Sequence, residues 1–183
     1  MIDICQNMNT SRDRYKNTAL CGVLIALAFI LSYVESLFPP MIAIPGVKLG
    51  LTNITVLSAI YLLDKKDALI INFVRILLGY LLFGTFISFL FSLSGGMLST
   101  IVMLLLVKRT KLKIITISVI GAISHNVGQI IIAVLMLHTT GVMWYFTALW
   151  FSGIVTGIII GFISGMVIKR CFKVTKDDHK HKI

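Results

Sequence analysis

The sequence predicts an all-α integral membrane protein with six transmembrane helices and both termini in the cytoplasm. Hydrophobic residues make up 57% of the 183 residues and charged residues only 13%, against ~45–50% and ~25% in soluble domains. The apolar residues form long runs, and basic residues cluster between alternate runs. This composition excludes an ordinary soluble domain, a disordered chain and a collagen-like fibre.

Each apolar run is taken as one or two membrane helices, since about 20 apolar residues cross ~30 Å of hydrocarbon. The second run is the weakest, because it contains Lys48, Thr52 and Asn53. The third run is long enough for two helices. The runs comprise residues 17–37, 47–63, 68–107, 114–137 and 144–168.

The position of the turn inside the third run follows from helix length. A break at Gly95-Gly96 would leave residues 97–107 for the next helix, only ~16 Å at 1.5 Å per residue. A break near Gly84-Thr85 leaves two segments of adequate length. We therefore expect the turn at residues 84–87, with Gly95 and Gly96 inside a helix.

The basic clusters orient the helices, because cytoplasmic loops are rich in Lys and Arg. One cluster precedes the first helix, and the others follow the second, fourth and sixth helices, while the alternate connections hold almost no basic residue. This alternation requires residues 47–63 to cross the membrane. The clusters are Arg12–Lys16, Lys65–Lys66, Lys108–Lys113 and Lys169–Lys173.

The chain is thus divided into a cytoplasmic tail (1–13), a six-helix membrane domain (14–173) and a second cytoplasmic tail (174–183). The net charge is +10, but the clustering of basic residues between apolar runs favours a lipid bilayer over nucleic acid as the partner. The first helix has no small-residue cleavage site and is expected to be uncleaved. The three cysteines show no CxxC spacing and are expected to be free thiols.

Polar residues inside the apolar runs are the candidate substrate-binding residues, because an ionisable group in a membrane costs at least ~2.5 kcal/mol. Most of them, together with Glu35, belong to the outer half of the helices. Their depth predicts a polar cavity that opens outward. The candidates are Lys48, Asn53, Arg75, His125, Asn126 and Gln129.

A purely structural role stays open for each candidate. Arg75 could extend its side chain to the cytoplasmic headgroups. Lys48 and Glu35 are also typical interfacial anchors. The cluster at residues 125–129 could be a hydrogen-bond network that only holds the helices together.

Small residues at four-residue spacing mark candidate surfaces for helix packing or for a partner. Such ladders let helix backbones approach closely, either within one chain or across an interface. Leu in the middle of the sixth-helix ladder should be damaging and Ala mild. The ladders are Gly153, Gly157, Gly161 and Gly165 in the sixth helix, and Gly22 and Ala26 in the first.

Sequence signatures of catalysis are absent. The chain has no P-loop, no HExxH motif, no Cys/His metal spacing, no nucleophile elbow and no Asp-rich pair for Mg²⁺. We therefore expect a protein that is not an enzyme, with no catalytic residue, cofactor or metal.

Several segments are typical of one family when they occur together: residues 45–54 (PGVKLGLTNI), 75–79 (RILLG), 83–85 (FGT), 94–96 (SGG), 121–122 (GA) and 125–129 (HNVGQ). In these segments the chain resembles the Gx transporter family, whose older name is heptaprenyl diphosphate synthase component I. The similarity covers about residues 15–170. The six candidate substrate-binding residues match positions of these motifs.

That family is similar to the S components of energy-coupling factor (ECF) transporters. The resemblance implies an S-component-like bundle in a bacterial plasma membrane, acting as the substrate-binding subunit of an importer. Its partner would be a transmembrane coupling subunit with two ATPases, docked near Gly22 and Ala26, although Ala19 and Val23 depart from the usual alanine pair. Because Lys48, Arg75 and His125 outnumber Glu35, a small anionic substrate is expected.

Two other functions stay open. The older family name implies a non-catalytic membrane component of a heptaprenyl (polyprenyl) diphosphate synthase in isoprenoid or quinone biosynthesis. The third alternative is a subunit of a membrane redox complex, for which the sequence shows no covalent attachment signal.

Overall fold

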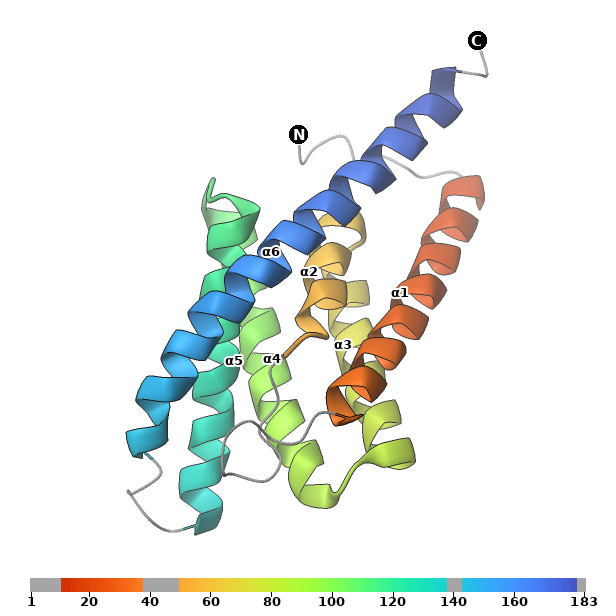
Figure 1. Ribbon diagram of the computed structural model, residues 1–183. Helices are drawn as coiled ribbons and strands as arrows, with labels where there is room; N and C mark the ends of the chain where they lie inside the picture. Colours follow the sequence, from red (N-terminus) through yellow and green to blue (C-terminus); the bar gives the residue numbers. More distant parts are fainter. Residues whose placement is uncertain (1–10, 38–49, 138–142, 181–183) are drawn as a thin grey trace.

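The computed structural model describes residues 11–37, 50–137 and 143–180, and within these ranges it contains six helices and no strand. The order of the helices along the chain agrees with the sequence prediction (Figure 1). The helices are α1 (Ser11–Leu37), α2 (Asn53–Leu62), α3 (Lys65–Phe83), α4 (Phe86–Arg109), α5 (Ile114–Leu137) and α6 (Met143–Lys180).

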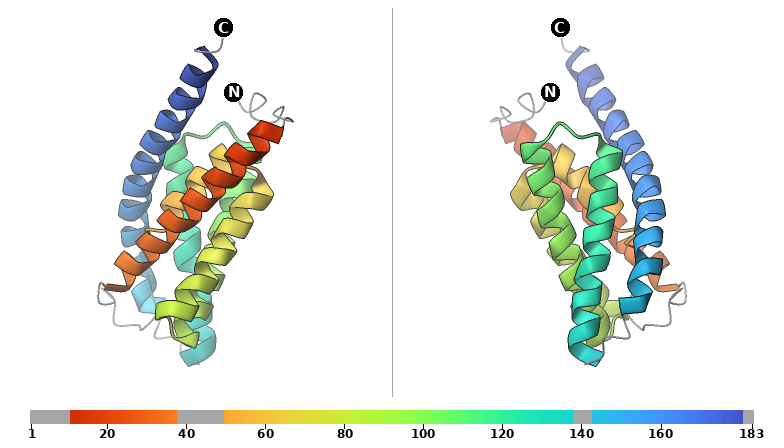
Figure 2. Two further views of the ribbon diagram at one scale, coloured as in Figure 1. Left: turned by 90° about the vertical axis from the view of Figure 1, so that its right-hand side faces the viewer. Right: turned by 90° about the vertical axis from the view of Figure 1, so that its left-hand side faces the viewer.

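The helices pack as one bundle around the short helix α2. α5 lies between α4 and α6, as the right-hand view of Figure 2 shows, and α3 packs against α4 and α1. α2 contacts α6, α3, α1 and α4. All eight residues 53–60 of α2 are buried, the polar Asn53, Thr55 and Ser58 among them. The main hydrophobic core therefore surrounds Val56, Leu57 and Ile60.

Four helices are long and apolar enough to cross a membrane, which supports a multi-pass membrane protein. They are α1, α4, α5 and α6. α3 has 19 residues but carries four charged ones. α2 has ten residues, or about 15 Å of helix, half the hydrocarbon thickness.

α2 begins later than the apolar run that predicted it. The run starts at Val47, whereas the helix starts at Asn53 after a turn over residues 50–52. Gly50 takes a positive φ of 79°, a conformation that favours glycine and that an α-helix does not contain. Residues 47–49, including the candidate Lys48, lie outside the described residues.

The predicted turn between the third and fourth helices is confirmed. α3 ends at Phe83 and α4 begins at Phe86, so that Gly84 and Thr85 form the connection and Gly95 and Gly96 lie within α4. Thr85 is the N-cap, and its hydroxyl accepts a hydrogen bond from the backbone N–H of Ser88 at 3.2 Å.

The C-terminal tail expected at residues 174–183 is helical as far as Lys180, because α6 continues through it. No Gly or Pro follows Gly165 in the sequence, so nothing there stops the helix. The start of α1, the α2–α3 and α4–α5 connections and the end of α6 lie at the same end of the bundle (Figure 1). Basic residues therefore gather at one end, the arrangement that the positive-inside pattern requires.

Candidate functional site

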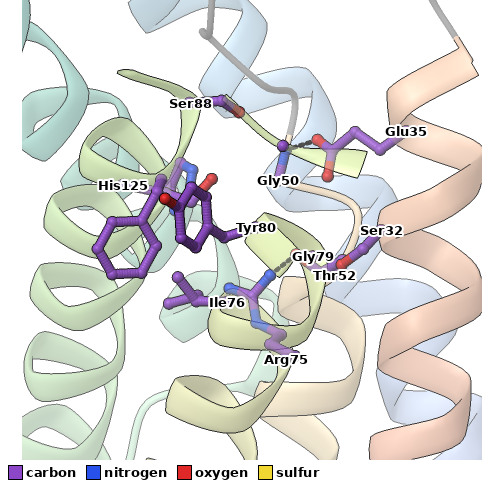
Figure 3. Close-up of a pocket in the computed structure, with 13 residues that line it drawn as sticks. Ser32, Glu35, Gly50, Thr52, Arg75, Ile76, Gly79, Tyr80, Ser88 and His125 are labelled. Carbon is purple, nitrogen blue, oxygen red and sulfur yellow. Dashed lines mark hydrogen bonds between the residues drawn. The ribbon is translucent and has the colours of Figure 1, made fainter. Parts of the chain in front are cut away.

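A small polar cavity lies between α1, α3, α4 and α5 (Figure 3). The cavity volume open to the centre of a water molecule is about 20 Å³. This is room for about one water. Polar groups reach it from four helices and from the turn before α2. The lining residues are Ser32, Glu35, Gly50, Thr52, Arg75, Ile76, Gly79, Tyr80, Gly84, Ser88, Phe89, Ser92 and His125.

Arg75 is the central cation of this cavity and is only 5% exposed. Its Nε donates a hydrogen bond to the Oδ1 of Asn72 at 2.8 Å, and its Nη1 donates to the hydroxyl oxygen of Thr52. The third nitrogen, Nη2, is buried and has no hydrogen-bond partner among the described residues. The guanidinium is therefore fixed on two sides, and it does not extend to the bundle surface as a snorkelling side chain would.

Glu35 brings a carboxylate to the same cavity from the end of α1 and is 7% exposed. Its Oε1 accepts a hydrogen bond from the backbone N–H of Gly50 at 2.5 Å. A Cβ on Gly50 would lie 3.1 Å from the Nδ2 of Asn53 and 3.7 Å from the Cδ2 of His125. The turn before α2 thus connects α1 to the polar residues of α2 and α5.

His125 reaches the cavity from α5, and Gln129 lies one turn later, fully buried. The Nε2 of Gln129 lies 3.1 Å from the Nε2 of His125, within hydrogen-bond distance. α4 approaches these side chains at Gly95, where a Cβ would be 3.1 Å from both the Cε1 of His125 and the Cγ of Gln129. Gln129 therefore contacts His125 but does not line the cavity itself.

Asn126 lies away from the cavity, although it follows His125 in the sequence. Its Nδ2 donates a hydrogen bond to the backbone carbonyl of Leu149 in α6 at 2.6 Å. A Cβ on Gly153 would come within 2.8 Å of this Nδ2. The structure thus places Asn126 at the α5–α6 contact and not among the residues that line the cavity.

Asn53 is the remaining predicted site residue that the structure describes. Asn53 is buried beside Gly50, and its Oδ1 has no hydrogen-bond partner among the described residues. Sequence reasoning omitted Thr52, Asn72 and Gly50 from the site. For Asn72 a signal was present, because it lies three residues before Arg75 and so shares its helix face.

The sixth-helix glycines are mostly internal packing residues. A Cβ at Gly157 would lie 2.6 Å from the Cα of Val119, and one at Gly161 would lie 2.8 Å from the Cα of Ile115. Gly153 contacts Asn126 as described above. A Cβ on Gly165, by contrast, would meet nothing within 4 Å. The ladder therefore serves the α5–α6 contact as far as Gly161 and no further.

The first-helix pair faces outward. A Cβ on Gly22 would meet nothing within 4 Å, and Ala26 is exposed on the bundle surface.

The described part of the chain holds no group of three or more His, Cys, Asp or Glu that could bind a metal ion. Cys21, one of the three cysteines predicted to be free thiols, forms no disulfide in the structure.

The family model described as heptaprenyl diphosphate synthase component I matches residues 24–167. This range includes every residue of the cavity. No curated protein and no solved structure matches the chain.

Proposed function

The chain belongs to the heptaprenyl diphosphate synthase component I family, and we propose that it is a non-catalytic membrane subunit that binds a small polar ligand at Arg75. The supporting observation is the incomplete hydrogen bonding of the Arg75 guanidinium. Two of its nitrogens are bound by Asn72 and Thr52, while Nη2 is buried and unpartnered among the described residues.

A purely structural arginine would have its donors satisfied by the protein. A buried donor without an acceptor costs ~1–3 kcal/mol, and more if the group is charged. An acceptor oxygen on a ligand would recover that free energy. The neighbouring cavity, at about one water in size, would hold the polar group of the ligand and not a large apolar body.

More specifically, we propose that the protein is the substrate-binding subunit of an ECF-type importer in a bacterial plasma membrane, a function that the presence of the cavity favours. All six helices would then belong to the membrane domain, with both termini in the cytoplasm. Gly22 and Ala26, on the exposed face of α1, leave room for a helix of a transmembrane coupling subunit that works with two ATPases. The cavity at Arg75 supplies the substrate site.

The family description directly favours a second candidate, a non-catalytic membrane component of a polyprenyl diphosphate synthase. The words "component I" imply a further component, which would carry the catalysis. Its contact surface would be the basic end of the bundle, where the α2–α3 and α4–α5 connections lie. Co-purification with a soluble Asp-rich synthase, and rescue of its activity, would favour this candidate.

Ligand binding is tested by purifying the protein in detergent and identifying small molecules that it releases on denaturation. We expect the wild type to release one compound and Arg75→Gln to release little of it. Arg109→Gln removes an exposed arginine outside the cavity and serves as the matched control. Equal release from Arg75→Gln, with its folding verified by melting and gel filtration, would refute a binding role for Arg75.

A further inference from the structure

The polar cavity is accessible from the side of the α3–α4 connection. The lining residues from α1, α5 and the turn before α2 are buried, and so are Arg75 and Ile76 of α3. The other lining residues are partly exposed, and all of them belong to the last turns of α3, the connection or the first turns of α4 (Figure 3). They are Gly79, Tyr80, Gly84, Ser88, Phe89 and Ser92.

Aromatic rings line the accessible side of the cavity. The ring centroids of Tyr80 and Phe89 lie 5.0 Å apart, and those of Phe89 and Phe86 lie 6.5 Å apart. Tyr80 and Phe89 border the cavity, whereas Phe86 is 60% exposed at the bundle surface. These three side chains therefore form a continuous, mainly apolar surface that leads from the cavity to the outside, and we call it the aromatic path.

The surroundings of the aromatic path are apolar as well. Leu81 and Ile87, on either side of the α3–α4 connection, are exposed, and no charged residue lies between Arg75 and Lys108 in the sequence. The part of α4 before Lys108 extends about 33 Å, the full thickness of the hydrocarbon, and places the connection at the hydrocarbon edge. A molecule that extends from the cavity on this side therefore contacts rings and aliphatic side chains.

We propose that the ligand of this cavity carries one hydrogen-bond acceptor group on an apolar part, with the acceptor at the Nη2 of Arg75 and the apolar part against the aromatic path. This inference rests on the function proposed above and specifies the chemical class of the ligand. The cavity has room for about one water, so only the acceptor atom lies inside it. The rest of the molecule lies on the aromatic path, where an apolar group gains free energy by leaving water and a second polar group would lose hydration.

Benzophenone is a suitable probe, because it has a single carbonyl acceptor between two phenyl rings and forms covalent adducts with nearby C–H groups under near-ultraviolet light. It is uncharged, so its binding does not depend on the net charge of the cavity. Adducts are mapped by mass spectrometry at a probe concentration below saturation. The yield in residues 76–92 is divided by the yield in residues 22–30 of α1, and this adduct ratio corrects for partitioning of the probe into detergent.

The variants interrupt the two parts of the proposed contact separately. Phe89→Ala removes the aromatic path beside the cavity, and Phe86→Ala removes its exposed end. We expect the adduct ratio to fall about threefold in each, and about tenfold in Arg75→Gln, which withdraws the charged donor. Phe151→Ala removes a phenylalanine that is 68% exposed on α6 and should keep the wild-type ratio. Melting and gel filtration of each variant establish that it folds.

An unchanged adduct ratio in folded Phe89→Ala, or in Phe86→Ala if Phe89→Ala does not fold, would overturn the inference. An equal fall in Phe151→Ala would also overturn it, because the ratio would then report exposed phenylalanines in general. A co-purified compound that depends on Arg75 and has no apolar part would overturn it while leaving the proposed binding function intact. A ratio that falls in the aromatic variants but not in folded Arg75→Gln would instead remove the binding role of Arg75.

Discussion

Gly128→Ala tests how closely α4 and α5 approach each other. A Cβ at this position would lie 2.8 Å from both the Cα of Gly95 and the carbonyl oxygen of Ser94, and 2.9 Å from the backbone nitrogen of Gly95. All three atoms belong to the backbone of α4, so no side-chain rotation can relieve the clash. The hydroxyl of Ser94 also donates a hydrogen bond to the carbonyl of Gly128 at 2.7 Å.

The expected loss follows from two opposing effects. Overpacking costs ~1–3 kcal/mol, and a clash with backbone belongs at the upper end, whereas Ala gains ~1 kcal/mol over Gly in helix propensity. The net loss in free energy of unfolding is about 2 kcal/mol. For a chain of this length, 1 kcal/mol moves the melting temperature by about 2–4 °C, so we expect a decrease of about 4–8 °C.

The assay is tryptophan fluorescence during heating in one detergent, with two controls. Gly165→Ala makes the same chemical change where a Cβ would meet nothing within 4 Å, and it should not destabilise. Gly121→Ala would meet the Sδ of Met103 at 2.6 Å, but a methionine side chain can move, so its loss should be smaller. A Gly128→Ala protein as stable as the wild type would refute the close approach of α4 and α5.

Three further predictions concern the α5–α6 contact and the topology. Gly157→Ala should lower the melting temperature measurably, contrary to the mild effect expected from sequence, because its Cβ would meet backbone of α5; wild-type stability would contradict this. Asn126→Leu should lower the free energy of unfolding by ~1 kcal/mol yet leave the amount of co-purified ligand unchanged. Loss of ligand at wild-type stability would support a binding role for Asn126. Single cysteines replacing Lys65 and Thr110 should react with an impermeant thiol reagent only from the cytoplasmic side, and one replacing Thr140 only from outside; labelling of position 65 from outside would refute six spans.

Depth along a helix could be predicted from the sequence, but rotation about its axis could not. His125 and Asn126 have nearly the same depth, yet successive residues on a helix point about 100° apart. His125 therefore reaches the cavity while Asn126 reaches Leu149 of α6. The neighbours of each face depend on how six helices pack, and no pattern within α5 specifies that.

Local chain geometry was predictable only where a strong signal existed. Gly84 and Thr85 interrupt a long apolar run, and length alone placed the turn there. The turn at Gly50 lies within an apolar run that reads as continuous helix, so the late start of α2 and the position of Thr52 beside Arg75 were missed. Thr52 is a site residue because of a contact with α3, 23 positions along the chain.

The adjacent glycines of α4 explain how both halves of the polar site come together. A Cβ on Gly95 would crowd His125 and Gln129 of α5, and one on Gly96 would lie 3.3 Å from both the Nη2 of Arg75 and the Oδ1 of Asn72 in α3. Because neighbouring helix positions point in different directions, two consecutive glycines open two faces of α4 at the same depth. α3 and α5 can then approach α4 together, which brings the guanidinium and the imidazole to one cavity. The pair is therefore a steric requirement of the site and not a flexible point in the helix.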